Sequence, residues 1–265
     1  MEESDPLRLE DYAVGPLRTL IYIPNFISAP EESQLLHHIY EAPMSKWKSL
    51  KNRRLQNWGG VVHEKGLLPQ DYPPTLSHHL LFSTSASMDH EDHQRICEQT
   101  GLFPSPINHV LINEYLPNQG IMVSAPGWAC LFPCRGNSIT RIPAVVDFTL
   151  TRDLMNRPPT TEDLRQIPAT KPKNPPPVSL LLMPHSLLIF KDEAYSNYLH
   201  GIEDSDVHSL AEVVNSPEGI GFQAEGAAGL EAGGEEQLQV VRRRATRVSL
   251  TCRLVPKVRR NLFKF

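Results

Sequence analysis

The segment Arg247-Val-Ser-Leu-Thr-Cys-Arg253, close to the end of the chain, alternates as a β-strand does and carries two arginines. Successive side chains of a strand point to opposite faces, so Arg247, Ser249 and Arg253 share one face. Arginine suits a fixed bidentate grip on a carboxylate better than lysine does. The same alternation also fits a solvated strand face, so the segment alone leaves both interpretations open.

A second polar pair lies in the segment 110–116, which is also predicted to be a strand. Asn113 and Tyr115 are two residues apart, so their side chains share a face. Between these two strands the chain contains Leu-His-Gly-Ile at 199–202. A single histidine before a glycine is more often structural than a metal ligand, so His200 decides nothing by itself.

The rest of the chain predicts mainly short strands, because apolar and β-branched runs alternate with proline-rich connections. Besides the two strands above, the predicted strands cover 19–27, 144–151, 178–183 and 186–191. The last two flank Pro184-His185 and are expected to form a tight hairpin. This pattern predicts a mainly β fold with N-terminal α structure, namely a double-stranded β-helix (jelly roll) with a helical layer.

The helical layer is predicted at residues 29–41. Ser28-Ala-Pro-Glu31 has the pattern of a capping box, and apolar residues follow at helical spacing. The segment Arg54–Gly60 ends in two glycines that permit a tight turn. We interpret this segment as a loop at the rim of a substrate pocket; the alternative is a packed Trp58 in a tight turn.

Residues 123–143 are the least regular part of the chain, because three prolines interrupt them and no periodicity predicts a strand. We expect a tail at residues 1–15 and an N-terminal extension with the helix and the rim loop at 16–106. A jelly-roll domain should cover 107–256, with two long loops at 157–177 and 215–236, and a basic tail should follow at 257–265.

The formal net charge of −4 hides a basic segment at residues 242–265, which contains nine Lys or Arg residues and no acid. Such a segment favours phosphate-rich partners, with a solvated tail as the alternative. The four cysteines do not form a disulfide framework, and Cys130 and Cys134 lack the second ligand pair that a zinc site needs. The longest apolar run, 178–190, is too short to span a membrane.

These motifs, together with the segment 22–28 near the start of the predicted fold, resemble those of the AlkB-type iron(II)/2-oxoglutarate dioxygenases. The segments 55–60 and 104–119 are most similar to the AlkB homolog 6 branch of that family. The resemblance implies that Asn113 and Tyr115 contact 2-oxoglutarate. It also implies that Arg247 grips the distal carboxylate with help from Ser249, that Arg253 lies near the iron-side carboxylate or the substrate, and that His200 is an iron ligand.

The chain departs from the family at the His-x-Asp pair that should follow Gly120. Ser124 and Pro126 occupy those two positions, and neither is a plausible iron ligand. The pair His90 and Asp92 has the required form, but it precedes the Asn113 strand and so lacks the structural context. By the same resemblance Asp147 is structural. A local replacement over 123–143 predicts an alternative exon or a gene-model error, which transcript sequence would test.

The resemblance implies oxidative demethylation of alkylated DNA or RNA, with Fe(II) and 2-oxoglutarate as cofactors and oxygen as cosubstrate. The expected localisation is cytoplasmic and nuclear. Because the metal pair is missing, the alternative is a catalytically inactive variant that binds nucleic acid or protein. A third interpretation, a small-molecule oxygenase, differs only in its pocket, and the sequence leaves it open.

Overall fold

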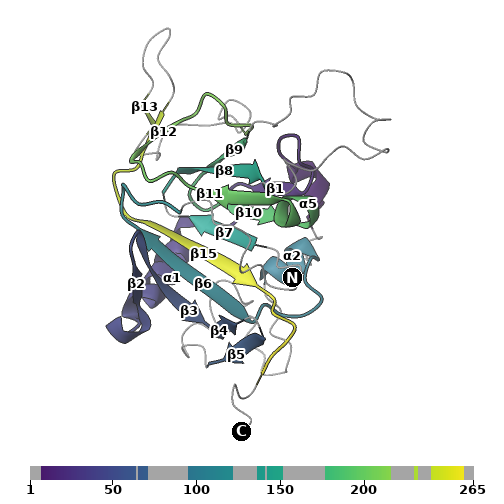
Figure 1. The fold of residues 1–265 in the computed structure, drawn as a ribbon, viewed down its shortest axis with the longest axis vertical. Coiled ribbons are helices and arrows are strands. Elements are labelled where there is room, and N and C mark those ends of the chain that lie inside the picture. Colours follow the sequence, from purple (N-terminus) through teal and green to yellow (C-terminus); the bar gives the residue numbers. More distant parts are fainter. Residues whose placement is uncertain are drawn as a thin grey trace.

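The computed structural model of the chain describes residues 7–63, 65–70, 95–121, 136–140, 142–151, 177–215, 230–231 and 240–259. A seven-stranded antiparallel sheet, called here the major sheet, dominates this part (Figure 1). Its strands, in spatial order, are β1 (Leu20–Ile23), β10 (Leu187–Phe190), β7 (Gly136–Thr140), β15 (Arg247–Arg253), β6 (His109–Tyr115), β3 (Arg53–Trp58) and β2 (Lys48–Leu50).

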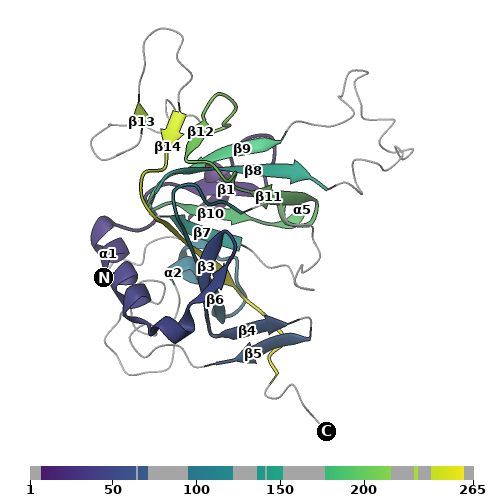
Figure 2. The same ribbon diagram turned by 60° about the vertical axis from the view of Figure 1, so that its left-hand side comes forward.

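Three smaller sheets make up the rest of the β structure in the described part of the chain (Figure 2). The minor sheet consists of β11 (Tyr198–Gly201), β8 (Ala144–Leu150) and β9 (Val178–Leu182), in that order. A further sheet contains β12 (Val207–Ser209), β14 (Val240–Arg242) and β13 (Leu230–Glu231), and β4 (Gly60–His63) forms a hairpin with β5 (Gly66–Pro69). The helices within the described residues are η1 (Leu9–Tyr12), α1 (Ala29–Glu41), η2 (Met44–Lys46), α2 (Arg95–Thr100) and α5 (Asp192–Ser196).

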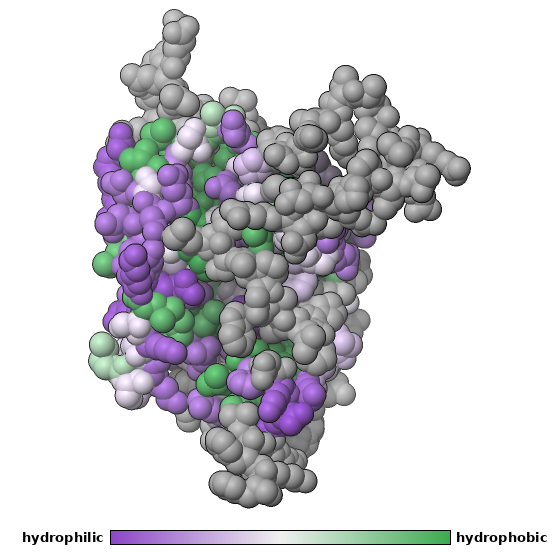
Figure 3. Space-filling model, viewed as in Figure 1, coloured by the Kyte–Doolittle hydropathy of each residue, from purple (hydrophilic) through white to green (hydrophobic). Residues whose placement is uncertain are grey.

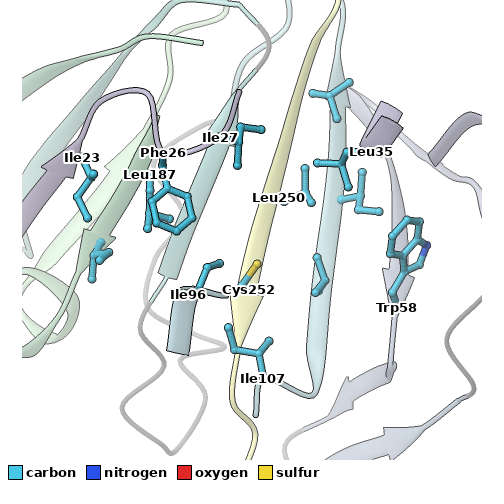
Figure 4. Close-up of a cluster of buried hydrophobic side chains, with 14 of the residues drawn as sticks. Ile23, Phe26, Ile27, Leu35, Trp58, Ile96, Ile107, Leu187, Leu250 and Cys252 are labelled. Carbon is cyan, nitrogen blue, oxygen red and sulfur yellow. The ribbon is translucent and has the colours of Figure 1, made fainter. Parts of the chain in front are cut away.

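The outer face of the major sheet is apolar and is covered by α1 and α2. Leu250 and Cys252 of β15 belong to one buried cluster with Leu35 of α1 and Ile96 of α2 (Figure 4). Burying a side chain of this size contributes about 1.5–3 kcal/mol. The outer face is therefore the main hydrophobic core.

Helix α1 begins and ends where the sequence predicts. Ser28 Oγ accepts from the Glu31 amide and the Glu31 carboxylate accepts from the Ser28 amide, so the capping box is confirmed. Glu31 also accepts a 2.6 Å hydrogen bond from Arg95, which ties the start of α1 to α2. This contact joins the two helices of the outer layer to each other.

The inner face of the major sheet packs on the minor sheet. Phe190 of β10 and Phe148 of β8 lie edge to face with their centroids 5.6 Å apart, inside a buried cluster drawn from both sheets. Two antiparallel sheets packed face to face, with a helical layer outside, confirm the predicted jelly roll.

Three local predictions were wrong. The strands β9 and β10, expected to form a hairpin, lie in different sheets, and the chain turns between them at His185 with φ 64°. The segment Arg54–Trp58, expected as a loop, is part of strand β3, and Trp58 is buried in the outer core. Strand β7 lies centrally in the major sheet although no periodicity predicted it.

The predicted domain bounds stay a prediction, although several elements bear on them. Strands β1 and β3, from the expected N-terminal extension, belong to the same sheet as β15. Leu9 of η1, from the expected tail, is buried in the core, and β13 lies within the expected loop 215–236. Among the described residues no helix is long and apolar enough to cross a membrane. The described surface seen in Figure 3 is mainly hydrophilic, with scattered apolar groups.

Candidate functional site

The two motifs that are far apart in the sequence are neighbours in the major sheet. Strand β15 runs beside β6 (Figure 1). The two strands pair so that Arg247 lies opposite Tyr115, Ser249 opposite Asn113 and Arg253 opposite His109. Cα partners in an antiparallel pair share a face. All six side chains therefore lie on the inner face of the major sheet, because the residues that alternate with them form the outer core.

Arg247 is a buried cation, only 2% exposed. Its guanidinium carbon lies 5.4 Å from the centre of the Tyr115 ring, and its Nε has no hydrogen-bond partner. Burial, together with the nearby charge of Arg243, lowers the pKa of Arg247 to about 10, so the group stays charged at neutral pH. No carboxylate pairs with it within the described ranges. A buried charge of this kind is costly unless a counter-ion binds.

Asn113 and Ser249 lie beside this arginine. Asn113 is 4% exposed and its Oδ1 has no hydrogen-bond partner, and Ser249 is 5% exposed. Buried polar atoms are normally paired, so an orphaned amide next to an orphaned guanidinium nitrogen indicates room for a polar ligand. The sequence predicted these residues to share a face, and the strand register brings them together.

Opposite the Arg253 end of β15, strand β6 begins with a histidine that sequence reasoning missed. His109 is 1% exposed; its Nε2 lies 3.3 Å from Asn57 Oδ1, while its Nδ1 has no partner. Burial, and then the charge of Arg253, lowers the pKa of His109 to about 3. The ring is therefore neutral. Continuing the two-residue alternation back from Asn113 would have found His109.

His200 lies on the minor sheet, in β11. Its ring is 4.9 Å from the Phe190 ring and 5.9 Å from the Phe148 ring, centre to centre. Surrounding protein, and then the charge of Arg253, lowers the pKa of His200 to about 4, although the residue is exposed to solvent. The imidazole therefore has many protein atoms around it and is still reached by solvent. The lowered pKa leaves the ring neutral at neutral pH.

The chain approaches β11 again directly after the turn that follows β6. Ile121 and Ile202 exchange two backbone hydrogen bonds of 2.9 Å. Gly120 permits this approach, because a Cβ there would lie 2.1 Å from the Ile202 carbonyl oxygen. The segment that lacks the His-x-Asp pair follows Ile121 in the sequence. Because Ile121 pairs with Ile202, two residues after His200, the chain enters that segment beside the end of β11.

Comparison with known proteins decides the family. No protein-family model matches the chain. This chain is 36% identical, over 265 aligned residues, to a Danio rerio protein described as "Probable RNA/DNA demethylase ALKBH6". The alignment covers 96% of this chain and 94% of the relative. The chain belongs to the AlkB family. This confirms the predicted resemblance, including its closeness to AlkB homolog 6.

Two solved structures are similar at the level of shape. "The structure of OsALKBH1" has a TM-score of 0.45 and 11% identity, and the match covers 91% of this chain and 99% of that one. A 2OG-Fe(II) oxygenase family oxidoreductase from Burkholderia pseudomallei has a TM-score of 0.49 and 10% identity, with 89% and 83% covered. These likenesses are weak, and the jelly-roll assignment depends on the sheets themselves.

The AlkB family implies Fe(II), and the described residues do not fit it. A non-haem iron site of this type needs two histidines and a carboxylate. Across the described ranges no group of three His, Cys, Asp or Glu residues could hold a metal, and His200 is left as a single candidate ligand. Asp147 accepts a 2.6 Å hydrogen bond from Ser179, in keeping with a structural role.

The remaining candidates for iron ligation cannot be placed. His90 and Asp92, and the positions Ser124 and Pro126, lie outside the described residues. The predicted roles of these residues therefore stay predictions.

The family's 2-oxoglutarate fits better than its metal. The inner face offers a buried arginine with an orphaned Nε, a buried amide with an orphaned oxygen, and a buried hydroxyl. Bidentate guanidinium–carboxylate pairing supplies both charge and geometry for one end of such a ligand. Arg247 and Ser249 therefore supply donors that match a carboxylate, and Asn113 does so once its amide is turned to present the NH₂ group in place of the orphaned oxygen.

Arg243 supports the same region, which corrects the interpretation of the basic segment. It is 1% exposed and donates to the backbone carbonyls of Leu116, Gln119 and Ser205. It thereby joins the turn after β6 to the segment after β11. Arg243 and Arg247 are both buried, so they are unavailable as a surface for phosphates.

Proposed function

We propose that this chain binds 2-oxoglutarate on the inner face of the major sheet, as a dioxygenase of the AlkB family. One observation carries the proposal: Arg247 is a buried, charged guanidinium with an orphaned Nε, beside the orphaned amide of Asn113. A dianionic ligand would neutralise a charge that the described residues leave uncompensated.

Each residue of the face has a distinct role in this proposal. Arg247 binds the distal carboxylate in a bidentate pair, and Tyr115 supports the cation through its ring face. Ser249 donates its hydroxyl, and rotation of the Asn113 amide brings its NH₂ group to the same ligand. Arg253, six residues further along on the same strand face, takes the keto-acid end or contacts the substrate.

We propose alkylated nucleic acid as the substrate class, demethylated oxidatively. The Danio rerio relative is described as a probable RNA/DNA demethylase, and the basic C-terminal segment keeps three exposed cations among its described residues: Arg244, Lys257 and Arg259. Such cations favour phosphate contacts whose strength falls with salt. Family enzymes reach a base in single strands or by flipping it, so single-stranded substrates are the first choice.

Turnover requires iron ligands in addition to His200. His90 and Asp92 are the two further candidates in the sequence, and a chain without them would keep only the binding function. The alternative exon or gene-model error over 123–143 stays a prediction, as does localisation in cytoplasm and nucleus. Transcript sequence and imaging of a tagged chain, respectively, would test these two.

The test is turnover of a single-stranded oligonucleotide that carries N-methylated bases, with Fe(II), 2-oxoglutarate and oxygen. The expected result is formaldehyde and succinate in equal amounts from the wild type, and neither from Arg247→Met. Succinate formation that survives Arg247→Met would contradict the assigned cosubstrate site. A folded, 2-oxoglutarate-bound wild type that releases no formaldehyde would contradict the demethylase activity and leave a binding module.

A further inference from the structure

Strand β2 and its flanks carry a dense run of cations that the 2-oxoglutarate site does not use. No Asp or Glu occurs between positions 42 and 63, and the segment 46–54 contains five Lys or Arg residues. These are Lys46, Lys48, Lys51, Arg53 and Arg54. The three lysines are exposed to solvent, so the segment presents a cationic surface.

Ser49 lies at the centre of this run, as the middle residue of β2. Lysines stand three residues before it, one residue before it and two residues after it. All three residues of β2 are exposed. The strand is the last of the major sheet and pairs with β3 alone among the described strands, so its outer edge is open (Figure 1). An exposed, extended segment of this kind can be read by a partner enzyme along its backbone and its side chains.

Two other exposed serines have different surroundings and serve as a comparison. Ser33 of α1 follows Glu31 and Glu32, and its hydroxyl donates to the Ala29 carbonyl at 3.0 Å. Ser45 has no cation in the three positions before it. Ser49 is therefore distinguished from both by lysines on its two sides.

A partner for an added phosphate lies across the strand pair. Ser49 is the Cα partner of Arg54 in the pairing of β2 with β3, so the two side chains share a face. Arg54 donates its Nε and Nη2 to Glu114, and its guanidinium carbon lies 4.2 Å from the centre of the Trp47 ring. These contacts hold the guanidinium in place and leave Nη1 for another acceptor. A phosphate on Ser49 would bring three acceptor oxygens to that side of the sheet.

We propose that Ser49 is a phosphorylation site for a serine kinase that selects basic residues around its acceptor. Acidic side chains in the groove of such a kinase complement the lysines, which decides the choice of serine. Ser49 Oγ attacks the γ-phosphorus of ATP; the Oγ–P bond forms, the P–O bond to ADP breaks, and the hydroxyl proton passes to the kinase's catalytic base. The phosphate brings a charge of about −1.5 to −2 into the run of cations and pairs with Arg54. This site is independent of 2-oxoglutarate binding.

The test treats the folded full chain with ATP, Mg(II) and a purified kinase catalytic domain that selects Lys and Arg on both sides of its serine. Fragmentation of the peptide 42–64, released by cleavage after glutamate, separates Ser49 from Ser45. We expect phosphate on Ser49 in the wild type and in Ser45→Ala, and a loss of most of the incorporated phosphate in Ser49→Ala. Changing Lys46→Gln together with Lys48→Gln should lower kcat/KM of the kinase for this chain at least about tenfold. Thermal melting checks that each variant is folded.

A second measurement tests the pairing with Arg54. The phosphorylated wild type should melt about 2–4 °C higher than the unmodified chain, and phosphorylated Arg54→Met should show no such rise over its own unmodified form. An equal rise in both proteins would reject Arg54 as the partner of the phosphate.

Three outcomes would overturn the phosphorylation site itself. The first is a wild-type chain that carries no phosphate on Ser49, and the second is a Ser49→Ala variant that takes up as much phosphate as the wild type. The third is modification of Ser49 in a heat-unfolded sample alone, because the kinase would then not read the folded edge strand.

Discussion

Arg247 lies opposite Tyr115 in the pairing of β15 with β6, and its guanidinium carbon is 5.4 Å from the centre of the tyrosine ring. An aromatic ring attracts a cation by about 0.5–2 kcal/mol, less than burying that cation costs. An anionic ligand bound to Arg247 would therefore stabilise the folded chain relative to its ligand-free state.

The first prediction concerns Arg247 without ligand. Because it lacks a carboxylate partner among the described residues, Arg247→Met should leave the free energy of unfolding unchanged or raise it by about 1–3 kcal/mol. Urea unfolding of the ligand-free chain measures this. The control is Arg54→Met, which removes the bidentate partner of Glu114 and should cost about 2–3 kcal/mol. Equal losses in the two variants would contradict the account.

The second prediction concerns pH. The unfolded chain protonates His109 near the ordinary pKa of 6.5, whereas the folded chain does so only near a pKa of about 3. Between these values the unfolded state binds more protons, so stability is fully present above pH 6.5 and falls on acidification, by up to about 1.4 kcal/mol per pH unit for this group.

The variant His109→Gln should reduce that slope by up to about 1.4 kcal/mol per pH unit, because glutamine does not titrate. Urea unfolding of both proteins between pH 6 and pH 4 measures it (the range lies roughly inside the window that the two pKa values define). An unchanged slope would show that His109 is accessible to protons in the fold.

The two-residue alternation of strand side chains predicted much of the site, and the capping box at Ser28 and Glu31 predicted helix α1. Asn113 and Tyr115 share a face, as do Arg247 and Arg253, because a strand leaves no other arrangement. The sequence could not show that these two pairs would be neighbours, since strand order depends on contacts between distant segments. His109 follows from the same alternation once the strand is extended.

Other features depended on tertiary structure. A two-residue connection at Pro184-His185 resembles a hairpin, but the positive φ of His185 belongs to a turn between two sheets. Counting charges suggested a basic surface around Arg243, whereas three backbone carbonyls bury it. Trp58 follows the simpler interpretation, because its place in the core and not its sequence neighbours decides its role.

The third prediction concerns Gly120. A Cβ at this position would lie 2.1 Å from the Ile202 oxygen and 2.6 Å from the Glu203 oxygen, and backbone cannot yield cheaply. Gly120→Ala should therefore cost about 2 kcal/mol or more. Gly101→Ala is the control: Gly101 has φ 59° with nothing within 4 Å, so only backbone strain of about 1 kcal/mol applies. A Gly120→Ala loss no larger than the control's would contradict the close approach.

The fourth prediction concerns Gln56, which is fully buried. It donates to the Ile39 carbonyl at 3.0 Å and accepts from Trp58 Nε1 at 2.7 Å, so it joins α1 to β3. Gln56→Leu orphans both groups and should cost about 2–4 kcal/mol in urea unfolding. Adding Trp58→Phe to that variant removes one orphan and should cost less than Trp58→Phe does alone. Strict additivity would argue against the network.

The measurement that tests the central claim most directly is calorimetric titration of 2-oxoglutarate, with Mn(II) present, into the wild type, Arg247→Met and Arg244→Met. The account predicts one site per chain in the wild type and in Arg244→Met, and a loss of at least about 100-fold in Arg247→Met. An Arg247→Met variant that is folded and binds 2-oxoglutarate as the wild type does would contradict the account.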